Sequence, residues 1–244
     1  MTDSDLFVTV KRSLEDQRSG YNIGTYNEQT QHMLLKLFYE PDINCHEVSY
    51  AGYIADILND RGITEIQTVG FRALHDKLAV YLSSYPVTVV YPVSQRQRIC
   101  WIDPETGESS FGRYTTYPKA KYKIIAELLS ILPMFPNEKL SLHIVSMDVS
   151  RHRLLNGYGS DKKKKATKLD TVPEELLNIT VIKDLDDIRA FLPFHSGDII
   201  TSNDISSALG LKRRQLWRAI KFLTLTEIII PDGKKGNAVL YKFT

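Results

Sequence analysis

The stretch YIADILNDRGITEIQT, residues 53–68, decides how the first half of the chain folds. It predicts two short strands joined by a tight turn at residues 59–62, where Gly62 is free to take a positive φ. Two carboxylates, Asp56 and Glu65, interrupt these largely apolar strands. A carboxylate in such a strand is costly unless a partner satisfies it, and a divalent cation is one such partner. The hairpin could therefore bring the two side chains together around a metal ion.

Length and composition limit the classes of protein. The chain has 244 residues, of which 43% are hydrophobic, and this suits one large domain or two unequal ones. No run approaches the roughly 18 apolar residues of a membrane span, and the acidic residues 1–5 do not begin a signal peptide. The two cysteines, Cys45 and Cys100, lack metal-binding spacing. We expect a cytoplasmic protein with reduced thiols and no membrane partner, although a disulfide stays open.

The segments around the hairpin alternate between helical and strand patterns. Apolar residues recur with helical spacing over residues 27–39 and 71–85, whereas residues 45–58, 63–69 and 87–93 have the character of strands. In chain order, the strand at residues 63–69, the helix at residues 71–85 and the strand at residues 87–93 form a β-α-β crossover, which requires parallel strands. The pattern predicts an α/β fold with a mixed sheet flanked by helices.

With Asp56 on one strand and the tripeptide EIQ at residues 65–67 on the next, the chain resembles the PD-(D/E)XK nuclease superfamily. The resemblance implies a restriction-endonuclease-like domain over residues 1–182, in which Asp56 and Glu65 bind catalytic Mg²⁺ or Mn²⁺. Many members add a glutamate from the preceding helix, where Glu28 lies, so Glu28 is a third candidate ligand. The chemistry fits, because Mg²⁺ neutralises phosphate charge and lowers the pKa of bound water.

The sequence departs from the usual E-x-K pattern, because Gln67 stands in place of the lysine. Some restriction endonucleases of this fold also have glutamine there, so the resemblance implies that Gln67 positions the attacking water. Glutamine can hydrogen-bond a water but brings no positive charge. Lys77, on the following helix, is the candidate to supply that charge, and its alternative is an ordinary exposed lysine. Asp56 and Glu65 could likewise be an edge-strand pair that faces water.

Residues 183–244 have the element order of a winged helix-turn-helix, which we expect to form a small second domain. The helix at residues 212–224 leaves basic and polar residues for its outer face, where they could pair with base edges, and the wing tip could lie on phosphate. The predicted DNA-binding residues are Lys212, Arg213, Arg214, Gln215, Arg218, Lys221, Lys234 and Lys235. Trp217 is expected to lie partly in the core. A winged helix that contacts protein is the alternative.

A second basic segment interleaves cations with tyrosines between residues 113 and 123. Arg113, Lys119 and Lys121 could line a groove beside the metal site and contact phosphate. The alternative is a solvated hairpin followed by the start of a helix. The lysine run at residues 162–165 is expected in an exposed loop.

Charge separates the two parts of the chain. Residues 1–150 contain 14 Lys and Arg against 18 Asp and Glu, whereas residues 151–244 contain 17 against 11. A basic second part favours a polyanion, and the predicted winged helix favours double-stranded DNA as that partner. The layout also resembles an uncharacterised bacterial family, which brings no established activity.

We predict a metal-dependent DNA endonuclease of restriction or defence type. The alternative is a non-catalytic DNA-binding regulator that retains a degenerate nuclease fold. RNA cleavage is less favoured, because winged helices mostly dock on duplex DNA. Nucleases that cut both strands often dimerise, so a homodimer stays open.

Overall fold

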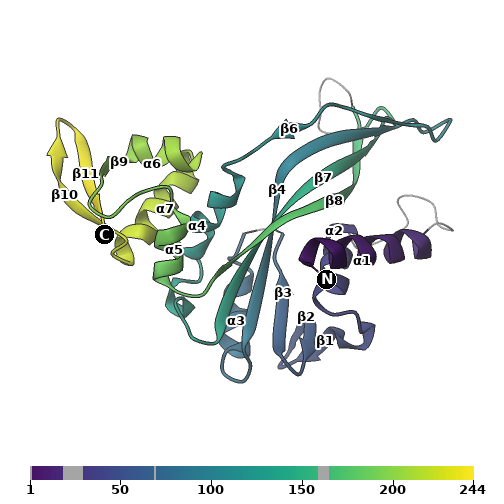
Figure 1. Cartoon of the computed structure of the whole chain (residues 1–244), viewed down its shortest axis with the longest axis horizontal. Helices are drawn as coiled ribbons and strands as arrows, with labels where there is room; N and C mark the ends of the chain where they lie inside the picture. The colour runs from purple at the N-terminus through teal and green to yellow at the C-terminus, as the bar shows by residue number, and fades with distance from the viewer. Residues whose placement is uncertain (1, 19–29, 69, 159–164) are drawn as a thin grey trace. The chain divides into compact units, whose positions relative to one another are not determined.

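The structure, a computed structural model, describes residues 2–18, 30–68, 70–158 and 165–244 (Figure 1). Its helices are α1 (Asp3–Arg18), α2 (Thr30–Tyr39), α3 (Leu74–Tyr81), α4 (Lys123–Leu128), α5 (Leu185–Phe191), α6 (Ser202–Leu209) and α7 (Arg213–Leu225). Three short 3₁₀ helices are η1 (Ile43–Cys45), η2 (Ala120–Tyr122) and η3 (Leu132–Met134). Its strands are β1 (His46–Tyr50), β2 (Tyr53–Asn59), β3 (Gly62–Ile66), β4 (Val87–Ile102), β5 (Ser109–Phe111), β6 (Thr115–Thr116), β7 (Leu140–Leu154), β8 (Thr167–Ile182), β9 (Ile199–Thr201), β10 (Ile229–Lys235) and β11 (Ala238–Phe243).

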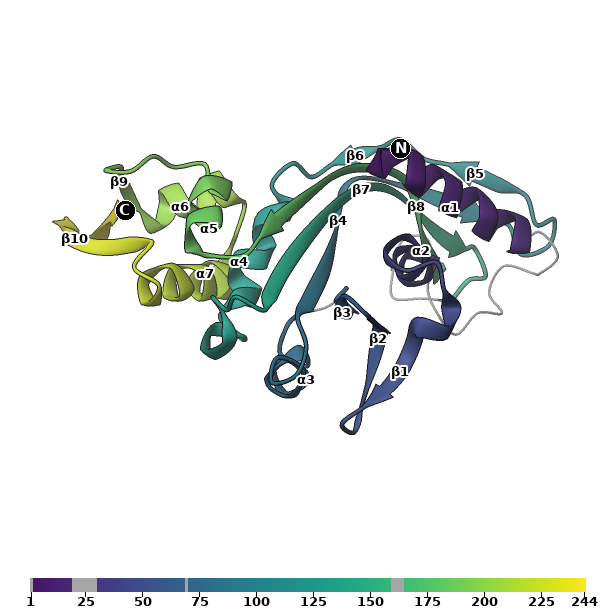
Figure 2. The ribbon, with the colours of Figure 1, turned by 60° about the horizontal axis from the view of Figure 1, so that its bottom comes forward.

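The large sheet is mixed and has the strand order β1-β2-β3-β4-β7-β8, with β5 and β6 each paired to β4 (Figures 1 and 2). β2 and β3 are antiparallel, whereas β3 and β4 are parallel and are joined through α3. These features confirm the predicted α/β class and the β-α-β crossover. β4 is 16 residues long and continues well beyond the strand expected at residues 87–93.

The hairpin between β2 and β3 forms where the sequence predicts it, with Asn59 paired to Gly62. Gly62 has a φ of +116°, and a Cβ at this position would lie 2.3 Å from the carbonyl oxygen of Pro86. Glycine is therefore required both by the backbone conformation and by the close approach. The N–H of Ile63 donates to the same carbonyl at 2.9 Å, which ties the turn to the residue before β4.

The chain forms two compact units, and β4, β7 and β8 contribute residues to both. The first unit consists of residues 1–46, 92–118 and 145–179, and the second of residues 47–91, 119–144 and 180–244. The domain boundary expected after residue 182 stays a prediction. Among the described residues, no helix is both long and apolar enough to cross a membrane.

In the first unit, α1 and α2 pack together and contact β8. The rings of Phe7 and Phe38 meet edge to face with their centroids 6.0 Å apart, and the Lys11 ammonium donates to the Glu174 carbonyl. The sequence does not predict α1 or β8. Of the lysine run, the structure describes Lys165, which is exposed.

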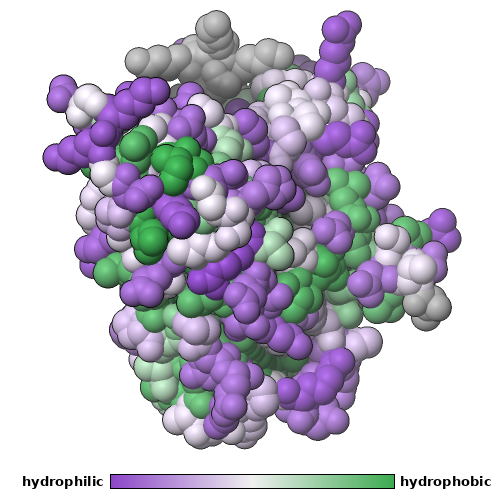
Figure 3. All heavy atoms as spheres, turned by 60° about the vertical axis from the view of Figure 1, so that its left-hand side comes forward, coloured by the Kyte–Doolittle hydropathy of each residue, from purple (hydrophilic) through white to green (hydrophobic). Residues whose placement is uncertain are grey.

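The C-terminal elements belong to the second unit and run in the order α5, β9, α6, α7, β10 and β11. The three strands form an antiparallel sheet of order β10-β11-β9. A capping box between Thr201 and Asp204 begins α6, and Gly210 ends it with a φ of +67°. The surface in Figure 3 mixes hydrophilic residues with smaller hydrophobic groups. Trp217 contributes to the exposed apolar surface, because 59% of it is accessible, so its expected place in the core is wrong.

Candidate functional site

Asp56 and Glu65 lie on neighbouring strands of the second unit. β2 and β3 pair from Asn59 opposite Gly62 to Ile57 opposite Thr64, and one further step in this register places Asp56 opposite Glu65. At this step, the N–H of Ile66 donates to Asp56 Oδ2 at 2.7 Å. The Asp56 carboxylate is therefore held against the backbone of β3, beside Glu65.

Glu65 is a buried carboxyl group with only 3% of the residue accessible. Its pKa is raised from an ordinary 4.5 to about 7, mainly by burial and then by the nearby charge of Asp56, while Lys77 opposes the shift. Two carboxylates that share a site disfavour joint ionisation. A carboxyl group poised near neutral pH is typical of functional sites, although buried ion pairs produce the same effect.

Lys77 reaches the acid pair from α3. Its Nζ lies 3.0 Å from Glu65 Oε2 and 3.3 Å from Oε1, and it donates to the Ile54 carbonyl at 2.8 Å. The ammonium is thus fixed on β2 and β3 rather than free in solvent. This is the position that the sequence-based hypothesis requires of a displaced lysine.

Tyr81, also on α3, has a fully buried side chain next to the carboxylates. Burial raises the pKa of its phenol, and the charges of Glu65 and Asp56 raise it further. Within the described part of the chain, its hydroxyl has no hydrogen-bond partner. A buried hydroxyl without a partner costs free energy. The sequence gives no signal for Tyr81 at the site, because its place in the helical pattern is that of an ordinary core residue.

Gln67 follows β3 and is tied to the loop before α3. Its N–H donates to the Val90 carbonyl at 2.8 Å, and its side-chain Nε2 donates to the Gly70 carbonyl at 3.2 Å. The bond to Gly70 orients the amide, while the predicted role in positioning water stays a prediction. Glu28 lies outside the described residues.

The basic residues of the helix that the sequence predicts to bind DNA do not all face solvent. Lys212, Arg213, Arg214 and Lys221 are exposed, Gln215 is half-buried, and Lys234 and Lys235 are exposed on the β10–β11 hairpin. Arg218 instead donates to the Ala126 carbonyl at 2.9 Å and to Ser130 Oγ at 2.8 Å. The expected outward position of Arg218 is therefore wrong, because α7 packs along α4 and this guanidinium binds the end of that helix.

Replacing Arg218 with alanine should lower the free energy of unfolding by about 1–3 kcal/mol, since hydrogen bonds of a charged donor are lost. Arg214→Ala on the same helix is the matched control, because Arg214 is exposed and should change stability by less than about 0.5 kcal/mol. Urea denaturation of both variants measures the difference. Equal stabilities would show that the contacts between Arg218 and α4 contribute nothing.

The second predicted basic segment is partly bound to protein. Arg113 is exposed. Lys119 instead donates to the Ser207 carbonyl at 2.5 Å, and Lys121 lies over the rings of Tyr122 and Phe191 at 5.1 and 5.3 Å. Lys119 and Lys121 therefore contribute to the packing of the second unit, and the expected phosphate contacts of this segment stay a prediction.

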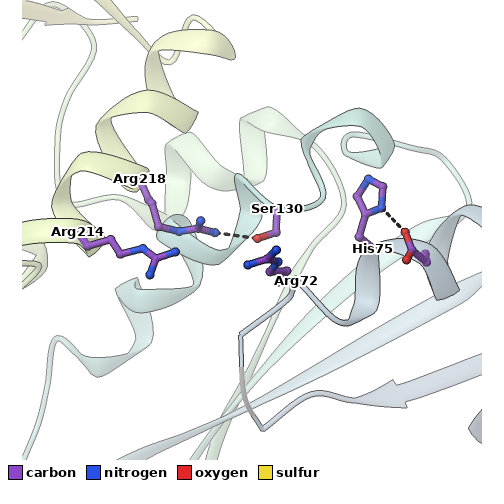
Figure 4. A pocket seen from close by; sticks show the side chains of 6 residues that line it. Arg72, His75, Ser130, Arg214 and Arg218 are labelled. Carbon is purple, nitrogen blue, oxygen red and sulfur yellow. Dashed lines mark hydrogen bonds and ion pairs between the residues drawn. The ribbon is translucent and has the colours of Figure 1, made fainter.

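A basic pocket that the sequence analysis did not anticipate lies between α3, α4 and α7 (Figure 4). It has a volume of about 430 Å³ and is lined by Arg72, His75, Asp76, Ser130, Arg214 and Arg218. These residues come from three separate parts of the sequence, and no local motif connects them. The pocket could be found only from contacts between these distant segments, and a single sequence does not show such contacts.

Comparison with known proteins gives a family but no activity. Residues 29–183 match the family described as "Domain of unknown function (DUF8091)". An uncharacterized protein of Treponema pallidum (strain Nichols) is 28% identical over 224 residues, which cover 90% of this chain and 87% of that protein. No solved structure gives a significant match. Because the match spans more than half of the chain, the protein belongs to the DUF8091 family.

Proposed function

We propose that this protein is a metal-dependent DNA endonuclease with a restriction-endonuclease-like sheet and a C-terminal winged helix. The observation that carries the proposal is the buried Glu65 carboxylate beside Asp56, with the Lys77 ammonium 3.0 Å away. The parallel β3–α3–β4 unit and the antiparallel β2–β3 pair support the resemblance to the nuclease superfamily. The order of α6, α7, β10 and β11 supports a winged helix.

The donor set at this site fits Mg²⁺ or Mn²⁺. The described residues contain no group of three or more histidine, cysteine, aspartate or glutamate side chains around one point, so a closed zinc-type site is not formed there. Mg²⁺ commonly needs only one or two carboxylates, with water and phosphate oxygens completing its shell. Asp56 and Glu65 supply those carboxylates, and the unpartnered hydroxyl of Tyr81 lies beside them. Glu28 stays a predicted third ligand.

Each of the four site residues has a definite role in this proposal. Asp56 and Glu65 would hold the ion, which when bound would neutralise phosphate charge and lower the pKa of a water molecule. Lys77 supplies the positive charge that Gln67 cannot, and it is already fixed beside the carboxylates. Gln67 contributes a hydrogen bond to the attacking water. The apolar strands around Glu65 exclude bulk water and so strengthen these charge interactions.

DNA affinity would come from the exposed cations of the C-terminal segment. Lys212, Arg213, Arg214, Lys221, Lys234 and Lys235 are accessible on α7 and the β10–β11 hairpin. Lysine and arginine side chains bind phosphates, and residues at the start of a recognition helix reach base edges in the major groove. The exposed Trp217, which lies 5.1 Å from the Lys221 ammonium, adds an aromatic surface there.

A non-catalytic DNA-binding regulator is the second candidate. The observation that favours it is that Lys77 already neutralises Glu65, so the site is satisfied in part without a metal ion. A structural Lys–Glu pair of this kind needs no chemistry. The two candidates differ in whether DNA is cleaved after it is bound.

Incubation of the protein with supercoiled plasmid and with linear duplex DNA, in Mg²⁺, Mn²⁺ or EDTA, tests the proposal. We expect cleavage in either metal and none in EDTA, because the carboxylates alone cannot activate water. Cuts in both strands at once would favour a homodimer. DNA binding without cleavage under every condition would replace the endonuclease with the regulator.

A further inference from the structure

The pocket between α3, α4 and α7 concentrates positive charge. Arg72 lies before α3, and Arg214 and Arg218 project from α7 towards it (Figure 4). All six lining residues belong to the second compact unit. Three guanidinium groups thus share one cavity of about 430 Å³.

Two of these three guanidinium groups are available to bind a ligand. Within the described residues, the side chains of Arg72 and Arg214 form no hydrogen bond or ion pair. Arg218 is held by Ala126 and Ser130, and its Nη2 is 3.9 Å from the Glu127 carboxylate. It therefore forms a fixed wall, whereas Arg72 and Arg214 can turn their donors to a ligand.

The nearby carboxylates do not balance this charge. Asp76, in the lining, is bound to His75 Nδ1 at 2.9 Å, and Glu127 approaches Arg218 at 3.9 Å and accepts weakly from the Phe71 N–H at 3.4 Å. Three guanidinium groups thus outnumber two carboxylates, and a bound anion would offset the remaining repulsion. The lining contains no apolar side chain, so an apolar ligand is excluded.

Arginine identifies the class of anion. Its planar fork of donors matches the oxygens of phosphate in a bidentate manner, and such charge-assisted hydrogen bonds are strong. Ser130 adds a hydroxyl, although this group already accepts from Arg218. The volume exceeds what a single phosphate group occupies, so a diphosphate or a sugar-phosphate chain fits better than an isolated ion.

We propose that the pocket formed by Arg72, Arg214 and Arg218 is a phosphate-binding site. The phosphate belongs either to the backbone of a nucleic acid or to a small phosphorylated molecule, and both present the same oxygens. This site requires neither a metal ion nor cleavage, so it goes beyond the proposed endonuclease. It also changes the role of Arg214, from reading base edges to binding phosphate beside α3.

Calorimetric titration of the full chain with pyrophosphate, in EDTA, tests the site directly. We expect the wild-type chain to bind, and Arg72→Ala and Arg214→Ala each to weaken binding about tenfold, as loss of a charge-assisted hydrogen bond requires. Arg72→Lys and Arg214→Lys should retain part of the affinity, because they keep charge but lose the fork. Arg12→Ala, an exposed arginine of α1, is the control for loss of one charge.

A second arm identifies the source of the phosphate. Binding of a duplex oligonucleotide is measured against salt concentration for the wild-type chain and the Arg72→Ala/Arg214→Ala variant. A nucleic-acid backbone in the pocket predicts a salt slope smaller by about two in the variant, one for each lost arginine. Pyrophosphate binding that depends on the two arginines, with an unchanged slope, assigns the pocket to a small phosphorylated molecule. An unchanged slope together with equal or absent pyrophosphate binding in both proteins overturns the phosphate site. The oligonucleotide arm, like the titration, is run in EDTA, so neither arm depends on cleavage.

Discussion

Replacing Glu65 with glutamine should lower metal-dependent DNA cleavage by about a thousandfold or more. Glutamine keeps the size of the side chain but loses the charge that holds a cation beside Asp56. Loss of about 4 kcal/mol of electrostatic stabilisation in the transition state corresponds to this factor. Initial rates on supercoiled plasmid in Mg²⁺ measure it.

The fold of the variant can be monitored separately from its activity. Burial raises the pKa of Glu65 to about 7, so a neutral amide is tolerated at this position and the protein should stay folded. Glu138→Gln, at an exposed glutamate, is the matched control and should cleave at the wild-type rate. Wild-type cleavage by Glu65→Gln would remove Glu65 from the catalytic site.

Stability should fall as the pH rises from 5 to 8, because the pKa of Glu65 is higher in the folded chain than in the unfolded chain. The folded state raises this pKa from 4.5 to about 7, so the stabilising contribution of the protonated group is complete below pH 4.5 and is lost as the pH rises through about 7. The difference corresponds to about 3 kcal/mol. Urea denaturation of the wild type and of Glu65→Gln at both pH values isolates this contribution.

The Glu65→Gln variant serves as the reference, because it contains every titrating group of the wild type except Glu65. The wild type should lose about 3 kcal/mol relative to Glu65→Gln between the two pH values. Saturating Mg²⁺ at pH 8 should restore stability to the wild type and not to the variant, because the ion binds the carboxylate of the folded chain. Parallel pH profiles for the two proteins would contradict the raised pKa of Glu65.

Local sequence was sufficient to predict the hairpin and its surroundings. Gly62 and the apolar alternation of β2 and β3 are signals within a few residues, and the apolar spacing around Leu74 and Leu78 predicts α3. These elements place Glu65 and Lys77 correctly, because strand alternation and helix periodicity decide which side chains share a face.

Elements that depend on distant partners escaped the sequence analysis. β8 contains Pro173 and the charged Glu174, two residue types that are uncommon inside strands, and Glu174 binds Arg98 of β4 and Tyr114. Likewise, α1 depends on Phe7 meeting Phe38 of α2. A charge inside a strand is stable only when its partner strand is known, and a single sequence does not show that pairing.

The orientation of α7 was the main error in the candidate site. Helical periodicity assigned Arg218 to the polar face, and this face does carry Arg214 and Lys221. The long arginine side chain nevertheless turns onto the Ala126 carbonyl of α4. Amphipathic patterns report which side of a helix is polar, but a second helix can also cover part of that side.

The central claim is that Asp56 and Glu65 together bind a divalent metal ion. Anomalous diffraction from crystals of the full chain soaked in Mn²⁺ tests it most directly, with a Glu65→Gln crystal as the control. We expect one manganese peak between the two carboxylates in the wild type and no peak there in the variant. Ordered wild-type crystals without that peak, with Lys77 still bound to Glu65, would show that the two carboxylates do not form a metal site.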